Sequence, residues 1–476
     1  METYKYSLNQ GENTMINTIV LAAGEGTRMR SKFSKSVHKV AGAPIIDWVV
    51  SAVEAVTDGE IICVVGKNGD GINEVLGDRV KYAIQEKRLG TGHAAMQAKN
   101  MLKEETTLVI GGDSPLITTK TLEKAYKTHQ KSGNTITVLT AKIKDQTGYG
   151  RIICDGEKLV KIVEEKDATA KEKKIVAVNS GIYFFDTKFL KSLEEKINNH
   201  NSQGEFYLTD SIEIALKEGK KVAPYLIEDE REILGVNNRH QLSHAEKILR
   251  NRIILEHMEK GVTFINPKAS YISKYAQIGM DTTIYPNTII EGKTKIGADC
   301  TIIGGRIKDS TIGNGCTIEQ SVILEAKIGH GTSIGPFAYV RPKSVIGNGN
   351  KVGSFVETKN SNIGNGTKLP HLIYVGDSDI GEHVNFGCGS LIANYDGKQK
   401  YRSKVGDDAF IGCNVNLISP VNVGEKAYIA AGTTVTKNVP GEALAIGRSY
   451  QENKEGWNKK VDPKIKVDSI LEEGVS

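Results

Sequence analysis

Two cations follow a glycine-rich turn near the start of the chain, a combination suited to binding phosphate groups. The apolar run of residues 16–22 leads into Gly24 and Gly26, and Arg28 and Lys35 come soon after. Backbone N–H groups of such a turn and the side chains of both cations donate to phosphate oxygens. The turn is neither a Walker loop, which ends in Gly-Lys-Ser/Thr, nor a dinucleotide fingerprint, which needs a third glycine. On its own, a Gly-x-Gly pair more often marks an ordinary turn between a strand and a helix.

The carboxylate of Asp113 is a candidate ligand for a divalent cation. Asp113 follows an apolar strand and a pair of glycines. Hard divalent cations such as Mg²⁺ prefer oxygen ligands, so a carboxylate at the end of a strand suits them. The alternative is an Asx turn ahead of Pro115, which explains the same residues without a metal.

A histidine in the second half offers a different chemistry. His371 lies in a Leu-Pro-His-Leu-Ile-Tyr segment, with Glu357 fourteen residues before it. Imidazole titrates near neutral pH and is therefore suited to act as a general base, for which Glu357 could orient the ring. The alternative is a surface histidine at a break in the local pattern.

Length and composition limit what can position these groups. The chain has 476 residues, 39% hydrophobic and 25% charged, which predicts a soluble protein of two or three domains. No run of about 20 apolar residues exists, so no membrane span is expected. The net charge of +5 gives no sign of a nucleic-acid partner. Six scattered cysteines without a CxxC pair argue against zinc and disulfides, and for a reducing cytoplasm.

The first half of the chain alternates strand-like and helix-like patterns. Residues 60–65 and 107–110 are predicted strands, and residues 45–56 a helix. This alternation over residues 16–236 predicts a mostly parallel sheet, with ligands at the carboxyl ends of its strands. Residues 1–15 precede it as a polar N-terminal extension without signal-peptide character. Residues 237–261 then predict a helical linker, with Asn237 as its N-cap and Gly261 at its C-terminus.

The second half repeats aliphatic residues every six positions. The series begins with Ile278, Ile284, Ile290 and Ile296, and glycine often follows the aliphatic residue. A helix cannot satisfy this period, whereas a three-sided parallel β-helix of hexapeptide repeats does. Irregular spacing over residues 302–328 predicts shortened sides of the coil. Residues 393–404 break the phase and predict a loop expelled from the coil, where functional residues commonly lie.

Several independent segments resemble one bacterial family. The nonapeptide at residues 21–29 is similar to the opening motif of sugar-nucleotide pyrophosphorylases. Over residues 16–460 the chain resembles the bifunctional N-acetylglucosamine-1-phosphate uridylyltransferases/glucosamine-1-phosphate acetyltransferases. The other matching segments are residues 85–93, 111–116, 148–151, 164–169, 179–181, 235–239, 341–342, 355–357, 394–397 and 430–435. The resemblance implies an α/β plus β chain: a Rossmann-like nucleotidyltransferase domain, a connecting helix and a left-handed parallel β-helix over residues 262–476.

For the nucleotidyltransferase domain, the resemblance implies uridylyl transfer from UTP to N-acetylglucosamine-1-phosphate with release of pyrophosphate. Asp113 and Asn237 would be the protein ligands of Mg²⁺, and Arg28 and Lys35 would neutralise phosphate charge. The remaining predicted substrate contacts are Leu21, Ala22, Ala23, Gly24, Gln85, Gly90 and Thr91 for uracil and ribose, and Gly150, Glu164 and Asn179 for the amino sugar. Two departures from the family are Ser34 where Pro is usual, and Ser36 where Val or Met is usual.

For the β-helix, the resemblance implies acetyl transfer from acetyl-CoA to glucosamine-1-phosphate, with His371 as the general base and Glu357 beside it. The sugar phosphate would be bound by Arg341, Lys359, Tyr374 and Asn385. The predicted acetyl-CoA contacts are Cys388, Asn394, Tyr395, Cys413, Ala431 and Arg448, with both cysteines interpreted as small fillers and not nucleophiles. The family also implies a cytoplasmic homotrimer with acetyl-transfer sites at subunit junctions.

Two other hypotheses remain open from the sequence. In one, the chain is a nucleotidyltransferase whose β-helix only oligomerises or regulates; His371, Glu357 and Lys359 speak against it. In the other, both folds form a non-catalytic assembly protein; the presence of Arg28 and Asp113 makes this the weakest of the three.

Overall fold

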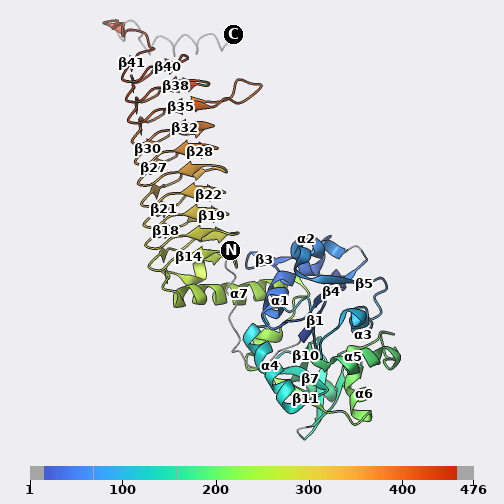
Figure 1. Cartoon of the computed structure of the whole chain (residues 1–476). Helices are drawn as coiled ribbons and strands as arrows, with labels where there is room; N and C mark the ends of the chain where they lie inside the picture. Colours follow the sequence, from blue (N-terminus) through green and yellow to red (C-terminus); the bar gives the residue numbers. More distant parts are fainter. Residues whose placement is uncertain (1–15, 68, 157, 458–476) are drawn as a thin grey trace, which may run out of the picture. The chain divides into compact units, whose positions relative to one another are not determined.

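The computed structural model describes residues 16–67, 69–156 and 158–457, so the predicted N-terminal extension, residues 1–15, lies outside the described residues. The chain forms two compact units. One comprises the N-terminal sheet domain, the long helix and the start of the β-helix, through Met280 and again over Ile284–Thr294. The other contains the rest of the β-helix. Both folds are visible in Figure 1.

A mixed sheet forms the centre of the first unit. Its strand order is β11-β7-β10-β6-β1-β4-β5, with a β8–β9 hairpin beside β10. The strands are β1 (Ile16–Leu21), β4 (Ile61–Gly66), β5 (Lys81–Gln85), β6 (Thr106–Gly111), β7 (Ile136–Lys142), β8 (Arg151–Asp155), β9 (Lys158–Val163), β10 (Ala177–Asp186) and β11 (Val222–Leu226). Except for β10, which runs antiparallel to β6 and β7, neighbouring strands of the main path are parallel. The mostly parallel sheet predicted from the sequence is confirmed.

Helices bury an apolar core on each face of this sheet. One core joins α1 (Ile45–Glu54), α2 (Ile72–Leu76) and α4 (Thr119–Ser132) to the sheet. The other joins α3 (Thr91–Met96), α5 (Thr187–Ser192) and α6 (Ser211–Lys217) to the opposite face. Within the predicted helix α1, Val49 and Val53 are fully buried. Burying one such side chain stabilises the fold by about 1.5–3 kcal/mol.

The connecting helix α7 (Arg239–Glu259) starts one residue later than predicted. Its N-cap is Asn238, whose side chain accepts a hydrogen bond from the Gln241 N–H at 2.8 Å. The prediction of Asn237 as N-cap is therefore wrong, because the side chain of Asn237 points its oxygen at Lys35. Gly261 adopts a φ of 87°, the left-handed conformation expected just beyond a helix C-terminus.

The six-residue period folds as predicted into a parallel β-helix. Three sheets of eleven, ten and nine described strands form its faces. The first face runs from β12 (Thr263–Phe264) to β41 (Leu444–Ala445), the second from β13 (Tyr271–Ile272) to β40 (Thr434–Val435), and the third from β14 (Gln277–Ile278) to β38 (Asn422–Val423). The repeated aliphatic residues, such as Ile284, Ile302 and Ile318, are fully buried inside the coil.

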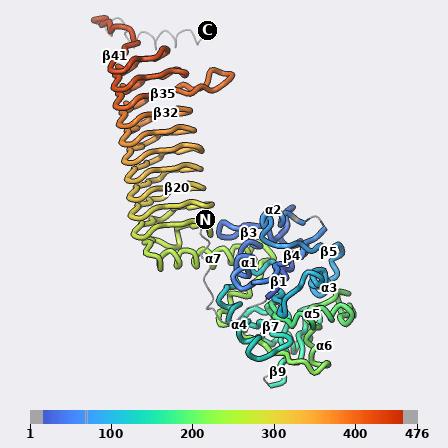
Figure 2. Tube along the Cα trace, viewed as in Figure 1, coloured from blue at the N-terminus to red at the C-terminus, as the bar shows by residue number. Residues whose placement is uncertain are grey.

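Two irregularities of the repeat appear as predicted. Over the irregular stretch the register pairs Ile302 with Ile318, sixteen residues on, while Ile334 pairs with Val352, eighteen residues on. The shortened coils therefore keep their core. Between β34 (Leu391–Ala393) and β35 (Ser403–Val405) the chain leaves the coil as a loop closed by a Tyr395–Lys400 bridge. Figure 2 shows this loop standing out next to β35.

Within the described residues, no helix combines the length and apolar character needed to cross a membrane.

Candidate functional sites

A cavity of about 680 Å³ lies at the carboxyl ends of β1, β5 and β6. Nine of its lining residues were predicted from the sequence: Leu21, Ala22, Ala23, Gly24, Lys35, Gln85, Gly90, Thr91 and Asp113. The parallel sheet explains this convergence, because the ends of neighbouring strands meet along one edge.

Lys35, Asp113 and Asn237 meet at one point of this region. Lys35 Nζ donates to Asp113 Oδ2 at 2.5 Å and to Asn237 Oδ1 at 2.7 Å. The Val236 N–H donates to the Asp113 carbonyl at 2.8 Å, which holds the two oxygen-bearing residues together although 124 positions separate them. A carboxylate and an amide oxygen that converge on one positive charge are the donor set that suits Mg²⁺.

Glycine is required where the wall of the cavity approaches another segment. Gly90 has a φ of 105°, and a Cβ there would lie 2.6 Å from the Phe206 carbonyl oxygen. The Gly90 carbonyl also accepts a hydrogen bond from Gln85 Nε2, a buried side chain that contacts His93 Nδ1 at 3.0 Å. Any larger residue at position 90 would displace the Phe206 segment from the cavity wall.

The three residues predicted to hold the amino sugar form a second group. A Cβ at Gly150 would lie 3.5 Å from both Asn179 Cβ and Glu164 Oε2. Asn179 is buried and donates from Nδ2 to Tyr183 Oη at 2.6 Å. Burial raises the pKa of Glu164, whose carboxylate accepts a hydrogen bond from Thr209. Ser180 and Gly181, directly after Asn179, line the cavity and connect the two groups.

Two other features of the site differ from the sequence prediction. Arg28 is exposed on a 3₁₀ turn (Thr27–Met29) and does not line the cavity. Arg88, which the prediction missed, does line it, and its guanidinium contacts the Ala23 carbonyl and Glu25. Arg88 lies between Gln85 and Leu89 in a segment that matched the family, so its position was a usable signal.

A larger cavity of about 810 Å³ lies among α1, α7 and the first coil, within the same unit. Its lysine and arginine side chains already have protein partners: Lys274 binds Asp47, Lys260 binds Glu256, and Arg252 donates to the Leu116 carbonyl. The smaller cavity, which carries Lys35 and Asp113, is the better candidate for phosphate chemistry.

In the β-helix, the predicted base and several acetyl-CoA residues share one column. The register of β27 (Lys351–Ser354), β30 (Lys368–His371), β33 (Asn385–Phe386), β36 (Phe410–Ile411) and β39 (Tyr428–Ile429) stacks these strands on the first face. It places His371, Cys388, Cys413 and Ala431 at equivalent positions of successive coils, where the first face ends. Arg448 lies beside this column, with its Cδ 3.8 Å from a Cβ built at Gly432.

The cysteines of this column do not fill the core. Cys413 is exposed and Cys388 is half-buried, so the interpretation of both as small fillers is wrong. Both cysteines occupy the position of His371 in their own coils, and their side chains lie at the surface of the corner.

A cluster of cations occupies the second face. Arg341 follows β25 (Tyr339–Val340), Lys359 ends β28 (Glu357–Lys359), and Tyr374 begins β31 (Tyr374–Gly376). Arg341 Nη1 donates to Glu357 Oε1 at 2.6 Å. The described residues contain no hydrogen bond between Glu357 and His371, so the expected pairing of those two side chains is not seen.

The expelled loop adds a cation that the sequence prediction missed. Contact with Lys400 lowers the pKa of Lys359. Two ammonium groups and the Arg341 guanidinium therefore gather on one surface, which favours binding of a phosphate group. Lys400 follows the Asn394–Tyr395 motif in the loop, but only the folded loop brings it back to Lys359.

The other predicted residues of this half lie in two different places. Asn394 is buried and donates to Asp377 Oδ2 at 2.5 Å and to Tyr374 Oη at 3.5 Å, so it belongs to the second-face group. Tyr395 is exposed in the loop. Asn385 lies on the first face, paired with Lys368, and does not meet Arg341, Lys359 and Tyr374 within the chain.

The described residues contain no cluster of three or more His, Cys, Asp or Glu side chains that could hold a metal. A metal at the first site would therefore use the mixed pair of Asp113 and Asn237, together with oxygens of the substrates.

Comparison with known proteins identifies the relatives of both halves. The nucleotidyl transferase family matches residues 17–232, and the bacterial transferase hexapeptide family, a motif of six repeats, matches residues 325–360 and 402–437. The predicted fold class, a Rossmann-like nucleotidyltransferase domain followed by a left-handed parallel β-helix, is confirmed.

Proteins similar over nearly the whole chain carry one printed name, bifunctional protein GlmU. The protein of Caldanaerobacter subterraneus subsp. tengcongensis is 52% identical over 94% of this chain and 98% of its own length. That of Thermoanaerobacter pseudethanolicus is 52% identical over 92% and 97%. That of Acetivibrio thermocellus is 50% identical over 92% and 96%.

Proposed function

The chain belongs to the family of bifunctional GlmU proteins. From this membership and the two sites, we propose which residues carry out each of its two reactions. It is a bifunctional enzyme that makes UDP-N-acetylglucosamine. The β-helix transfers an acetyl group from acetyl-CoA to glucosamine-1-phosphate. The N-terminal domain then transfers a uridylyl group from UTP to the acetylated sugar phosphate and releases pyrophosphate. The product supplies peptidoglycan and other cell-envelope precursors.

The convergence of Lys35, Asp113 and Asn237 at the cavity supports the uridylyl-transfer assignment. The sugar phosphate attacks the α-phosphorus of UTP directly, so no covalent enzyme intermediate is needed. The protein must align two anions and offset their repulsion, which is positioning and electrostatics. Lys35 carries positive charge at the cavity, and Arg28, on the exposed turn outside the lining, is the second proposed phosphate contact. The backbone around Leu21, Ala22, Ala23 and Gly24 holds the nucleotide with Gln85, Gly90 and Thr91, and Gly150, Glu164 and Asn179 hold the amino sugar.

Mg²⁺ fits the donor set at this site. Asp113 Oδ2 and Asn237 Oδ1 already converge on one cationic group, the Lys35 ammonium. When bound, the metal would neutralise phosphate charge next to these oxygens. Lys35 is placed to donate to the phosphates beside them.

For acetyl transfer, His371 is the proposed general base, accepting a proton from the attacking amine of the sugar. Its column with Cys388, Cys413 and Ala431, and with Arg448 nearby, offers a continuous strip along which acetyl-CoA can lie. Arg341, Lys359 and Tyr374, together with Lys400, bind the sugar phosphate, and Asn394 and Tyr395 contact the substrates from the loop. Glu357 acts by holding Arg341 in place.

We propose a homotrimer in the cytoplasm, with each acetyl-transfer site completed between subunits. Asn385 supports this proposal, because it lies on a different face from the other sugar-phosphate residues of its own chain. Closed rotational symmetry brings unlike faces of neighbouring subunits together. Sedimentation that finds a stable, acetyl-transferring monomer would contradict the trimer.

One assay separates the two reactions and the competing hypotheses. The protein is incubated with UTP, Mg²⁺, acetyl-CoA and glucosamine-1-phosphate, while pyrophosphate and free thiol are measured separately. We expect both products, with pyrophosphate dependent on prior acetylation. Pyrophosphate from pre-acetylated sugar without any thiol release would favour the single-activity nucleotidyltransferase, and neither product would favour a non-catalytic assembly protein.

A further inference from the structure

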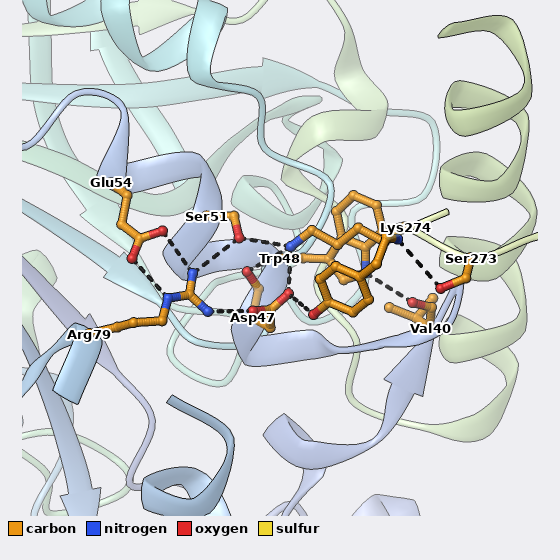
Figure 3. Close-up of polar contacts among 9 residues, drawn as sticks. Val40, Asp47, Trp48, Ser51, Glu54, Arg79, Ser273 and Lys274 are labelled. Atoms are coloured by element: carbon orange, nitrogen blue, oxygen red, sulfur yellow. Dashed lines mark hydrogen bonds and ion pairs between the residues drawn. The ribbon is translucent and has the colours of Figure 1, made fainter. Parts of the chain in front are cut away.

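Lys274, in the first coil of the β-helix, makes an extensive set of contacts with the nucleotidyltransferase domain. Both belong to the same compact unit. Lys274 Nζ donates to Asp47 Oδ2 at 2.5 Å, to the Asp47 carbonyl at 3.1 Å and to Ser51 Oγ at 2.8 Å. Figure 3 shows Lys274 reaching α1 and the Trp48 side chain beside it. Three acceptors satisfy all three protons of the ammonium group.

This contact is buried, and Asp47 accepts hydrogen bonds from two cations. The side chain of Lys274 is 15% exposed and that of Asp47 is 5% exposed. The ammonium lies 4.6 Å from the centre of the Trp48 ring. Tyr275 Oη and Arg79 Nη1 also donate to Asp47, at 2.6 and 2.5 Å. Burial alone would raise the pKa of Asp47, but the hydrogen bonds from Lys274, Tyr275 and Arg79 outweigh it and hold the pKa below its usual value.

The same coil clamps the hairpin that follows the phosphate-binding turn. The hairpin consists of β2 (Lys39–Val40) and β3 (Ala43–Pro44). The Lys274 N–H donates to the Ala41 carbonyl at 3.1 Å, and a Cβ at Gly42 would lie 2.6 Å from Ser273 Oγ. Trp48 Nε1 donates to the Val40 carbonyl at 2.9 Å. The turn between the strands therefore has little freedom to move relative to the first coil.

Two short connections lead from these contacts to the cavity. Lys35 precedes the hairpin by four residues, and the His38 N–H donates to the Lys35 carbonyl at 3.2 Å. On the other side, Ile46 precedes Asp47 in α1, and its Cδ1 lies 2.9 Å from a Cβ built at Gly112, the residue before Asp113. Lys35 and Asp113 bind each other. Lys35 is connected to the 39–44 hairpin and Asp113 to α1, and Lys274 contacts both of these elements.

We propose that Lys274 is a positioning residue for uridylyl transfer: it fixes the 39–44 hairpin and the first turn of α1, and through them the distance between Lys35 and Asp113. This rests on the uridylyl transfer proposed above. The first coil of the β-helix is therefore part of the nucleotidyltransferase, and the boundary between the two activities lies after it. A misplacement of about 1 Å can cost about 10²-fold in rate, so loosening this clamp should be measurable.

The test uses the full-length chain and its two activities. In Lys274→Met, which keeps the aliphatic stem but removes the charge, we expect kcat/KM for UTP to fall by about 10- to 100-fold. The KM for N-acetylglucosamine-1-phosphate should change by less than about twofold, since its proposed contacts at Gly150, Glu164 and Asn179 lie on other elements. Thiol release from acetyl-CoA should also stay within about twofold. Lys274→Arg should restore most of the UTP efficiency.

Two further variants keep the proposal open to refutation. Lys268→Met, an exposed lysine in the same coil, should leave UTP kinetics unchanged. If Lys274→Met does not fold, Tyr275→Phe, which removes one hydrogen bond to Asp47, should still raise the KM for UTP about threefold. Unchanged UTP kinetics in a folded Lys274→Met or in Tyr275→Phe would overturn the proposal, as would an equal loss of both activities. Pyrophosphate release by the wild-type protein tests the proposed function separately, because its absence would contradict uridylyl transfer itself and not the role of Lys274.

Discussion

In the first compact unit, residues from several strand ends meet around one cavity, whereas in the β-helix the predicted site residues lie on two faces of the coil. Leu21, Gln85 and Asp113 end or follow different strands of one sheet and still line the same space. Arg341 and Asn385 belong to neighbouring stretches of the β-helix and yet lie on different faces. The topology of an open parallel sheet gathers strand ends, and the topology of a three-sided coil separates its faces.

This difference implies that only one of the two activities depends on a neighbouring subunit, and that the two sites act independently of each other. The uridylyl-transfer site should be complete in one chain, and the acetyl-transfer site should need a neighbour. Substitutions at one site should leave the other activity intact, because distant sites rarely couple.

The largest effect is expected at the proposed metal ligand. Asp113→Ala removes the carboxylate that Lys35 contacts, and should lower uridylyl transfer by about 10³-fold or more while acetyl transfer is nearly unchanged. The measurement is pyrophosphate release from UTP and free-thiol release from acetyl-CoA in the same preparation. Loss of both activities in a folded protein would refute the separation of the two sites.

At the second site, His371→Ala should lower acetyl-transfer turnover by about 10²–10⁴-fold, the usual effect of removing a positioned base. Acetyl-CoA binding and uridylyl transfer should survive. His383→Ala is the matched control, because His383 is exposed on the next coil and outside the column of His371. Thiol release against pH is measured for both variants. Wild-type turnover with an unchanged pH profile in His371→Ala would place the base elsewhere.

The two regions should also differ in their response to acid. Burial lowers the pKa of His129, in α4 of the first unit, to about 4. Between pH 6.5 and 4 the unfolded chain binds a proton that the folded chain excludes, so the stability of this unit should fall as pH decreases, by at most about 3 kcal/mol. The described coils after Thr294 contain no buried histidine.

Urea unfolding followed by Trp48 fluorescence in a Trp457→Phe background measures the acid response of the first unit. His129→Gln, which cannot titrate in this range, should flatten the dependence on pH. An acid response of unchanged size in that variant would assign the effect to other groups.

The smallest effect is expected in the phosphate-binding turn. Ser34, where the family usually has Pro, has a φ of −54° and a ψ of 143°, which proline also adopts. Its N–H makes no hydrogen bond among the described residues, and its buried Oγ has no partner. Ser34→Pro should therefore stabilise the first unit by about 0.4–1 kcal/mol without loss of uridylyl transfer. Ser34→Ala is the control, and an equal gain in that variant would exclude the backbone effect of proline.

Local sequence patterns predicted the fold and the cavity wall correctly. They did not predict side-chain partners that come from distant parts of the chain. The six-residue period and the glycine-rich turn predicted the β-helix and the cavity wall, since each is encoded within a few neighbouring positions. The sequence could not show that Glu357 pairs with Arg341 instead of His371, or that the loop returns Lys400 to Lys359. It also assigned the helix cap to Asn237, because neighbouring asparagines are equally good caps and only the contact with Lys35 distinguishes them.

The boundary between the activities that we propose is a second example. From pattern alone, the β-helix begins at residue 262 and belongs to acetyl transfer. The contacts of Lys274 with Asp47 and of Ser273 with Gly42 tie its first coil to the other domain. Such contacts join residues more than 200 positions apart and leave no periodic signal.

Co-assembly of two inactive variants tests the central difference between the regions most directly. Arg341→Ala and Asn385→Ala chains with different affinity tags are coexpressed, and mixed oligomers are purified through both tags. If each acetyl-transfer site takes Arg341 from one subunit and Asn385 from its neighbour, every mixed trimer has one intact site of three and should show about a third of wild-type thiol release. Mixed oligomers as inactive as either parent would mean that the site lies within one chain and would contradict the account.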